Sequence, residues 1–259
     1  MKRATILSVF LILVAAASAP AQKSAGAPAY FLLADSTIAT QDAGDWAAAA
    51  AMTANAHAQH AAGNLFATYR QLTGGPDEAV RVFFPFNKMA DLDGWVSNRQ
   101  VLYETIGKDR GQLVLDDLDL GRDSSERIVA YSEKLSRSPE TVRAAKILWV
   151  VEVEIEAGSM VEYSALALRV KKAFEQAGGE QTWLVYGNAI GGDRSQLTYL
   201  YGFDEFASLD DWPSRMEVLT AAHGEEEAAR LSAALESLAK TKTSLWALES
   251  ELSQLSGKE

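Results

Sequence analysis

The sequence predicts an α+β protein built from two tandem βαββαβ units that pack sheet on sheet into one intramolecular barrel. Two observations lead to this prediction. Residues 30–137 and 146–255 repeat one pattern at a constant offset of 117 positions, without a gap. Between positions 90 and 107, eight of eighteen residues are identical to their partners, where average composition gives about one by chance.

The second copy shows the order of elements most clearly. Residues 148–155 alternate apolar and polar side chains as a strand does. The second helix is expected from Ser208, because Ser208 and Asp211 can form a capping box and Pro213 is tolerated in a first turn. Strands are expected at 148–155, 182–186, 196–203 and 244–248, and helices at 159–177, from 208, and at 225–240.

The first copy follows the same order, with Gly74-Gly75 as a turn. Its expected strands lie at 30–39, 79–86 and 128–131, its helices at 44–62 and 91–106, and a helix followed by a loop at 107–123. This order is that of a ferredoxin-like split βαβ unit. Each unit leaves one sheet face bare, and two units in one chain can cover these faces by forming a closed barrel. Residues 138–145 are the expected linker.

The N-terminus has the features of a secretion signal over residues 1–21. Met1-Lys2-Arg3 is the positive start, Ile6 to Ala17 the apolar stretch, and Ala19-Pro20-Ala21 a small-x-small cleavage site. The apolar stretch is too short to span a bilayer, so no stable membrane anchor is expected after cleavage. The chain has no cysteine for lipid attachment or disulfides. We therefore expect an exported soluble protein, periplasmic or secreted.

The net charge of −11 argues against binding to nucleic acid. No basic stripe with interleaved aromatic residues is present in the sequence. Nor does the sequence contain a Walker loop, a nucleophile elbow, a Cys/His zinc cluster or a glycosidase carboxylate pair. Because the two copies can pack against each other within one chain, we expect a monomer whose two halves form an internal pseudo-dimer.

Two segments of the second copy resemble a strand-turn-helix of monooxygenase-like proteins. They are residues 201–212, with the sequence Tyr-Gly-Phe-Asp-Glu-Phe-Ala-Ser-Leu-Asp-Asp-Trp, and residues 218–223, with the sequence Val-Leu-Thr-Ala-Ala-His. The chain as a whole resembles the dimeric α/β-barrel superfamily in fused form. Members of that superfamily include antibiotic-biosynthesis monooxygenase-like and NIPSNAP-like proteins. The superfamily hosts oxygenases, haem enzymes, isomerases and proteins without known chemistry, so the resemblance implies a fold and not one activity.

His223 is the single candidate catalytic residue. Leu209, Trp212, Met216, Leu219 and His223 follow helical spacing, which predicts that the imidazole lies on a buried stripe. In haem-degrading members of the family that the chain resembles, a histidine near this helix end binds the iron. Those proteins also use an asparagine on the first strand and a tryptophan at the end of the third. Here Glu152 and Glu154 stand on the first strand and Gly202-Phe203 ends the third. No cofactor is therefore expected, with haem as the alternative.

His57 and His60 are the remaining histidines. His57 stands where the second copy has Phe174, on the inward stripe of its helix, so a core position is expected. His60 follows three residues later, and the two could form a metal pair on one helix face. Because no third ligand follows at metal spacing, no metal site is predicted.

Acidic residues recur on the first strand of each copy, at Asp35 and Glu152, and Arg81 stands where the second copy has Thr198. Strand alternation predicts that these side chains point away from the helices, into the barrel or its rim. A buried carboxylate needs a partner. The sequence therefore predicts that Arg81 pairs with Asp35, either as a structural ion pair or as part of a site for a polar ligand.

The second copy is richer in aromatic residues than the first. This composition predicts an apolar pocket between its sheet and helices, or else a larger core. The candidate ligand-binding residues are Trp183, Tyr186, Tyr199, Tyr201 and Trp212, together with Arg81, Asp35 and Glu152.

Three functions remain open from the sequence. The first is a barrel that binds a small organic, largely apolar ligand or acts as an assembly module. The second is a cofactor-independent or haem-type monooxygenase-like enzyme that uses His223. The third is a purely structural protein whose pockets are filled by side chains. The sequence does not identify a ligand, a substrate or a reaction.

Overall fold

The computed structural model describes residues 27–73, 78–137, 144–178 and 181–255. The expected signal peptide and most of the expected linker lie outside these residues. No helix in the described ranges combines the length and the apolar character needed to cross a membrane.

The described residues form a closed antiparallel barrel of eight strands. Around the barrel, the strands follow the order β1-β3-β2-β8-β5-β7-β6-β4. The strands are β1 (Tyr30–Ile38), β2 (Ala67–Thr73), β3 (Glu78–Phe86), β4 (Arg122–Tyr131), β5 (Ile147–Ile155), β6 (Leu184–Ile190), β7 (Gln196–Phe203) and β8 (Ala239–Leu248). Pairing of β2 with β8 and of β4 with β6 joins the two halves of the chain into one barrel.

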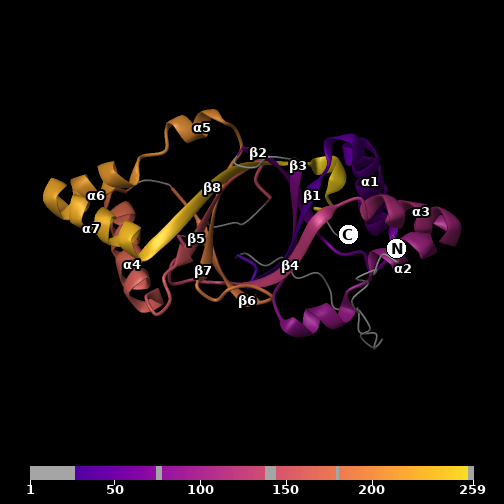
Figure 1. The fold of residues 1–259 in the computed structure, drawn as a ribbon, viewed down its shortest axis with the longest axis horizontal. Helices are drawn as coiled ribbons and strands as arrows, with labels where there is room; N and C mark the ends of the chain where they lie inside the picture. Colours follow the sequence, from indigo (N-terminus) through magenta and orange to yellow (C-terminus); the bar gives the residue numbers. More distant parts are fainter. Residues whose placement is uncertain (1–26, 74–77, 138–143, 179–180, 256–259) are drawn as a thin grey trace, which may run out of the picture.

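Helices cover the barrel at two opposite ends of the molecule, with the strands between them (Figure 1). The helices of the first half are α1 (Ala43–Gln59), α2 (Asn98–Ile106) and α3 (Lys108–Leu118). Those of the second half are α4 (Met160–Gln176), α5 (Ala207–Asp210), α6 (Arg215–His223) and α7 (Glu225–Leu238). Short 3-10 helices are η1 (Thr40–Asp42), η2 (Met89–Gly94) and η3 (Ser250–Leu252).

The strand registers of the two halves match at the offset of 117 residues. Asp35 on β1 lies opposite Arg81 on β3, and Glu152 on β5 lies opposite Thr198 on β7. In the closed order, β1 and β5 are four strands apart and thus on opposite sides of the barrel. Asp35 and Glu152 therefore face each other across its interior.

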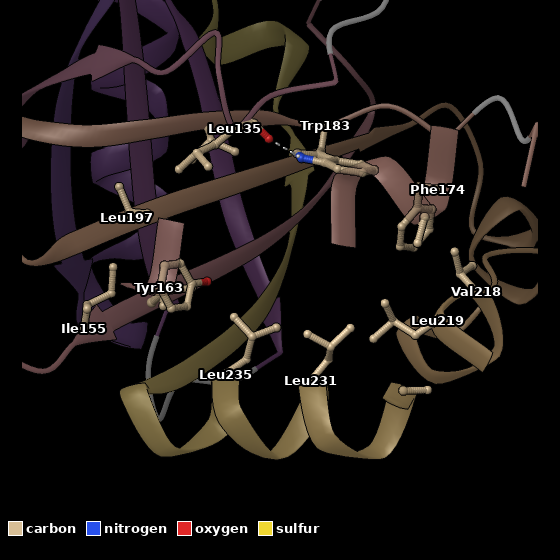
Figure 2. Close-up of a cluster of buried hydrophobic side chains, with 14 residues drawn as sticks. Leu135, Ile155, Tyr163, Phe174, Trp183, Leu197, Val218, Leu219, Leu231 and Leu235 are labelled. Atoms are coloured by element: carbon tan, nitrogen blue, oxygen red, sulfur yellow. Dashed lines mark hydrogen bonds between the residues drawn. The ribbon is translucent and has the colours of Figure 1, made fainter. Parts of the chain in front are cut away.

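Alternation along each strand separates two kinds of core. One face of the strands points into the barrel interior, here called the lumen, where residues of both halves pack together, including Leu33, Phe83, Val150, Tyr186 and Trp246. The other face packs against helices, and the largest such cluster lies in the second half (Figure 2). Long-range strand pairing thus builds the lumen, while each half buries its outer face under its own helices.

Most expected elements agree with the structure within a few residues. Strand β2 was not among the strands expected for the first copy, β8 begins at Ala239 and not at 244, and three further elements differ. The last strand of the first half, β4, begins at Arg122 and not at 128. The helix expected over 91–106 is divided into η2 and α2, and Ser97 caps α2 by accepting a hydrogen bond from the Gln100 N–H. Helix α3 confirms the helix expected after residue 107.

The third difference concerns the helix expected from Ser208. The segment forms the single turn α5, then a non-helical stretch over 212–214 with an extended backbone at Ser214, and α6 begins only at Arg215. Its capping box uses Ser214 and Glu217, so the prediction of a box at Ser208 and Asp211 is wrong. A later helix start changes which side chains face the sheet.

Candidate functional site

A pocket of about 410 Å³ lies between the sheet and the helices of the second half. Its walls are mostly aromatic and aliphatic. The lining residues are Leu135, Trp149, Val151, Val153, Tyr163, Ala167, Val170, Phe174, Trp183, Tyr199, Tyr201, Leu209, Trp212, Pro213, Ser214, Arg215, Leu235 and Thr241. Four of the predicted ligand-binding residues, Trp183, Tyr199, Tyr201 and Trp212, thus line one pocket.

Regular spacing places these side chains. On β5, the outward residues are Trp149, Val151 and Val153, and on β7 they are Tyr199 and Tyr201, as strand alternation requires. On α4, the spacing of Tyr163, Ala167, Val170 and Phe174 puts one helical stripe against them. The small side chain of Ala167 in the middle of this stripe leaves part of the space open.

Trp183 forms one wall of the pocket. Its Nε1 donates a hydrogen bond to the Leu135 carbonyl oxygen at 2.9 Å, and its ring meets Phe174 edge to face with centroids 5.2 Å apart. Figure 2 shows Leu231 and Leu235 of α7 pointing toward this indole from below. The indole is thereby fixed in position, with its polar atom satisfied.

Three tyrosines place hydroxyl groups around this otherwise apolar space. The hydroxyls of Tyr163 and Tyr199 lie 3.3 Å apart and share a hydrogen bond. Among the described residues, none forms a hydrogen bond with the hydroxyl of Tyr201. Burial raises the pKa of Tyr163, Tyr199 and Tyr201, and in Tyr199 the neighbouring Tyr163 raises it further. The three phenols are therefore neutral at pH 7 and act as hydrogen-bond donors, not as phenolate bases.

Arg215 carries the one positive charge among the described residues that line the pocket. It is the first residue of α6, directly after the Ser214 cap. Its Nη2 donates to Ser232 Oγ and to Glu236 Oε1, both at 2.8 Å, which holds the guanidinium at the helix-side rim. Its proximity works against the effect of burial on the pKa of Tyr163 and Tyr201.

These polar groups are specific to the second half. At the positions 117 residues earlier, Tyr163, Tyr199 and Tyr201 are replaced by Trp46, Val82 and Phe84. Arg215 is replaced by Asn98, whose side chain is bound to a buried histidine. The first half therefore uses packing groups where the second half has hydroxyls and a cation.

Tyr186 does not join this pocket, although it belongs to the same predicted set. It lies on the lumen face of β6, is 1% exposed, and donates a hydrogen bond to the Pro28 carbonyl oxygen at 3.2 Å. The reason is the strand period of two, since Trp183 and Tyr186 lie an odd number of residues apart.

Asp35, Arg81 and Glu152 lie in the lumen and form an ion cluster there with Arg127. Arg81 Nε donates to Asp35 Oδ1 at 2.5 Å, and Arg81 Nη2 donates to Glu152 Oε1 at 2.8 Å. Arg127 on β4 reaches the same two carboxylates, each at 3.2 Å. The predicted pairing of Arg81 with Asp35 is therefore present. Because Glu152 comes from the second half, the cluster also ties the halves together.

Because its positive and negative charges balance, this cluster serves mainly as a structural contact between the two halves. Two carboxylates face two guanidinium groups, and the guanidinium of Arg81 also lies 4.9 Å from the centroid of the Trp246 ring. Burial acts to raise the pKa of Glu152, but the nearby Arg81 and Arg127 outweigh it and lower that pKa. Glu152 therefore stays charged at neutral pH.

His223, the predicted catalytic residue, lies away from the pocket. It is the last residue of α6 and lines a polar hollow with Gly224, Glu225–Glu227 and Arg230, while its Nε2 is buried and has no hydrogen-bond partner among the described residues. Met216, on the stripe expected to be buried, is 38% exposed. The later start of α6 explains this, because Leu209 and Trp212 precede the helix and no longer share its face.

His57 is a core residue, as expected from its partner Phe174. It is 1% exposed, its Nδ1 accepts from the Asn64 N–H at 3.1 Å, and its Nε2 donates to Asn98 Oδ1 at 2.9 Å. His60 instead contacts Glu104 at 2.8 Å. Within the described ranges, no group of three potential metal ligands occurs. Both nitrogens of His57 are thus occupied by protein contacts.

Burial, followed by repulsion from His60, lowers the pKa of His57 despite its bond to Asn98. Protonation then favours the unfolded chain once the pH falls below the ordinary value of about 6.5. We expect the free energy of unfolding to decrease as the pH falls from about 7.5 to about 5.5. In His57→Phe this decrease should be smaller, and the stability at the higher pH lower by about 1–3 kcal/mol, because Asn64 and Asn98 lose their partner. Urea unfolding at both pH values checks this, and parallel pH profiles for the two proteins would contradict it.

Sequence reasoning missed four residues that matter here: Trp149, Tyr163, Arg127 and Arg215. Tyr163 and Trp149 could have been found from the helical stripe and from strand alternation. Arg127 stands 117 residues before Ser244, the same kind of difference that singled out Arg81 against Thr198. Arg215 had no such signal, because its position depends on where α6 begins.

Haem was the alternative cofactor, and the residues of the pocket do not fit it. Iron in haem proteins is held by histidine, cysteine, methionine or a tyrosinate. None of the described residues lining the pocket is a histidine, cysteine or methionine, and the hydroxyls of Tyr163 and Tyr199 are paired with each other.

Comparisons with known proteins place the fold. No family model and no curated protein matches this chain. Among solved structures, a candidate monooxygenase from Lactobacillus acidophilus NCFM is 9% identical, with 87% of this chain and 96% of that chain covered and a TM-score of 0.51. An anthrone oxidase-like protein is 10% identical, with 89% and 96% covered and a TM-score of 0.50. A haem-binding protein from Thermus thermophilus is 12% identical, with 88% and 94% covered, and its TM-score of 0.47 supports no argument. At these identities the likeness concerns the α+β barrel fold alone.

Proposed function

We propose that the protein binds a small aromatic molecule bearing an oxygen acceptor, such as a phenol, aryl ketone or aryl carboxylate, in the pocket of the second half. One observation carries the proposal: neutral tyrosine donors, one of them without a partner among the described residues, surround an otherwise apolar space. Donors in such a space discriminate strongly, since an unpaired polar group there is costly.

Size and lining support this class of ligand. A volume of about 410 Å³ lies within the range of roughly 300–1,000 Å³ common for small-molecule sites. Trp149, Trp183 and Trp212 offer aromatic surfaces, and aromatic rings prefer edge-to-face or offset packing with such partners. Arg215 at the rim favours a ligand with partial or full negative charge on its oxygen.

A thermal-shift screen of phenols, aryl ketones and aryl carboxylates tests the proposal. Binding raises the melting temperature with increasing occupancy, and a ligand concentration of about 100 Kd adds about 2.7 kcal/mol to the stability. We expect shifts in the wild type and in Ala165→Phe, because Ala165 is exposed on α4. Ala167→Phe, two residues further on the lining stripe, should remove them. A flat screen, or equal shifts in Ala167→Phe, would refute the proposal.

We further infer that residues 30–137 and 146–255 are two ferredoxin-like repeats joined by a linker over 138–145. The matching registers and the shared offset support this. Since the repeats close one barrel between them, a monomer is expected, and size-exclusion chromatography with light scattering measures it. Export to the periplasm or medium, after loss of residues 1–21, remains a prediction from the N-terminal sequence.

A monooxygenase-like activity is the second candidate, favoured by the likeness to the Lactobacillus acidophilus structure in fold. The pocket offers hydrogen-bond donors for such a reaction but no titratable base among its described lining residues, apart from the neutral tyrosines. A haem-dependent form would use His223, and hemin titration tests it. A Soret shift that is lost in His223→Ala would support that form, and the absence of a shift would exclude it. The open volume of the pocket disfavours the third reading, a structural protein with filled pockets.

A further inference from the structure

A second and larger cavity, of about 610 Å³, lies at one end of the lumen. Its other walls differ from those of the aromatic pocket, with which it shares only Trp183 among the described lining residues, because the inward faces of strands from both halves line it. The side chains that face it from the strands are Phe31 on β1, Ala67 and Tyr69 on β2, Phe83 and Pro85 on β3, Leu148 on β5, Leu184 on β6 and Leu200 on β7.

Successive inward residues close this cavity on the inside. On β1 the inward order from the cavity is Phe31, Leu33, Asp35, and on β5 it is Leu148, Val150, Glu152. Leu33 and Val150 are 1% and 0% exposed, so the layer below the cavity is packed. Beneath it, the ion cluster of Asp35, Arg81, Arg127 and Glu152 crosses the barrel. Among the described residues, the cavity is therefore closed on its inner side and open at its own end of the lumen.

The cavity is broad and shallow. On β2, β3 and β7 only two successive inward positions line it, which corresponds to about 7 Å of strand. Across the barrel it spans from Phe31 on β1 to Leu148 on the opposite strand β5. Gly202, inward on β7, allows Ala145 to pack closely against this strand, since a Cβ there would lie 2.9 Å from the Cβ of Ala145. A compact ring system fits such a space better than an extended chain does.

The chemistry of the walls differs from that of the aromatic pocket. Tyr69 lines the cavity, but its hydroxyl already donates to the Ala145 carbonyl oxygen at 2.9 Å. Tyr186, which packs against Phe31 in the lumen, donates to Pro28. Among the described residues lining the cavity, the only charged one is Asp204, after the end of β7. Apart from Asp204, Thr182 and Gln254, the walls thus present mainly hydrocarbon and rings, with no guanidinium and no free phenol among the described lining residues.

We propose that this end of the lumen is a second ligand site, which takes a neutral, compact polycyclic hydrocarbon or a close relative of one. Phe31, Tyr69 and Phe83 form an edge-to-face aromatic set on one side, with centroids 5.4 Å and 5.5 Å apart along the set. Leu148, Leu184 and Leu200 form an aliphatic side. A flat apolar molecule gains contact with both sides. The site is independent of the proposed function, since it shares neither the tyrosine donors nor Arg215.

Pyrene is the probe, because its emission spectrum reports transfer from water to an apolar environment. We expect saturable binding to the full chain. Ala67→Phe projects a ring into the cavity and should weaken this binding by on the order of tenfold or more, as overpacking does. Leu184→Phe, at a partly buried position of the same wall, gives a second blocking variant should Ala67→Phe fail to fold. Ala167→Phe, which blocks the other pocket, and the exposed Ala165→Phe should bind pyrene as the wild type does.

Several outcomes would overturn the assignment. They are an absence of pyrene binding to the wild type, unchanged binding in the folded lumen variants, and loss of binding in Ala167→Phe alone. Tighter binding of palmitate than of pyrene would overturn the choice of a ring system over a chain. The screen on the second-half pocket can fail while pyrene still binds to the lumen, so the two proposals are tested separately.

Discussion

Replacing Arg81 with methionine is expected to lower the free energy of unfolding by about 3–5 kcal/mol, the usual cost of breaking a buried charge cluster by removing one partner. Arg81 contacts both carboxylates, and its side chain is only 6% exposed. Its loss leaves Asp35 and Glu152 facing each other across the lumen with one guanidinium between them. Because Glu152 belongs to the second half, the loss also removes a tie between the halves.

Arg127→Met is the matched control for this substitution. Arg127 reaches the same two carboxylates, but at 3.2 Å and with 18% of its side chain exposed, so a smaller loss is expected. Adding Asp35→Asn to Arg81→Met should restore part of the stability by removing an unpaired charge. Urea unfolding of the wild type and the three variants measures these differences. A loss below about 1 kcal/mol in Arg81→Met, as for surface ion pairs, would mean that the cluster is not a structural tie.

Replacing Trp183 with alanine is expected to cost about 3–5 kcal/mol, the range for truncating a buried aromatic side chain. The indole is 5% exposed and packs against Phe174 and Tyr201. Its Nε1 also satisfies the Leu135 carbonyl oxygen, so truncation leaves a buried acceptor without its partner. The same change enlarges the aromatic pocket and weakens the affinity for any ligand that contacts this wall.

Comparing Trp212→Ala with Trp183→Ala shows how much of the stability loss comes from the depth of burial and how much from the removal of an aromatic ring. Trp212 meets Tyr201 and Phe203 edge to face, but it is only partly buried and lies outside a helix. A smaller loss is therefore expected than for Trp183→Ala. Thermal and urea unfolding give the comparison, and equal losses in the two variants would show that the Leu135 contact and deeper burial of Trp183 contribute little.

The architecture was largely predictable from the sequence because it depends on periodicity and repetition. The offset of 117 residues, strand alternation and helical spacing are local signals, and the registers at Asp35 and Glu152 agree with them. The closed pairing of β2 with β8 and β4 with β6 follows from the need to bury two bare sheet faces.

The break before α6 was not predictable in the same way. Both Ser208 and Ser214 precede an acidic residue by three positions, so either could begin a capping box. Tertiary packing decides between them, since Trp212 packs against Tyr201, Phe203 and Trp149 and residues 212–214 lie outside a helix. That choice places Arg215 at the pocket.

The residues of the candidate site could also be predicted only in part from the sequence. Composition indicated an aromatic second half, and alternation assigned the acids to the lumen. Neither signal separated Tyr186, which faces the lumen, from Tyr199 and Tyr201, which face the helices, because aromatic content alone carries no direction. Applying the period of two to β6 would have made that distinction.

Calorimetric titration with 2-naphthol, an aromatic molecule with one hydroxyl, tests most directly whether the second-half pocket is the ligand site. With the lumen cavity blocked by Ala67→Phe, we expect one binding site per chain, with affinity unchanged on adding Ala165→Phe or His223→Ala and weakened by at least about 100-fold, or about 2.7 kcal/mol, on adding Ala167→Phe. Affinity that survives in Ala167→Phe but is lost in His223→Ala would contradict the assignment of this pocket.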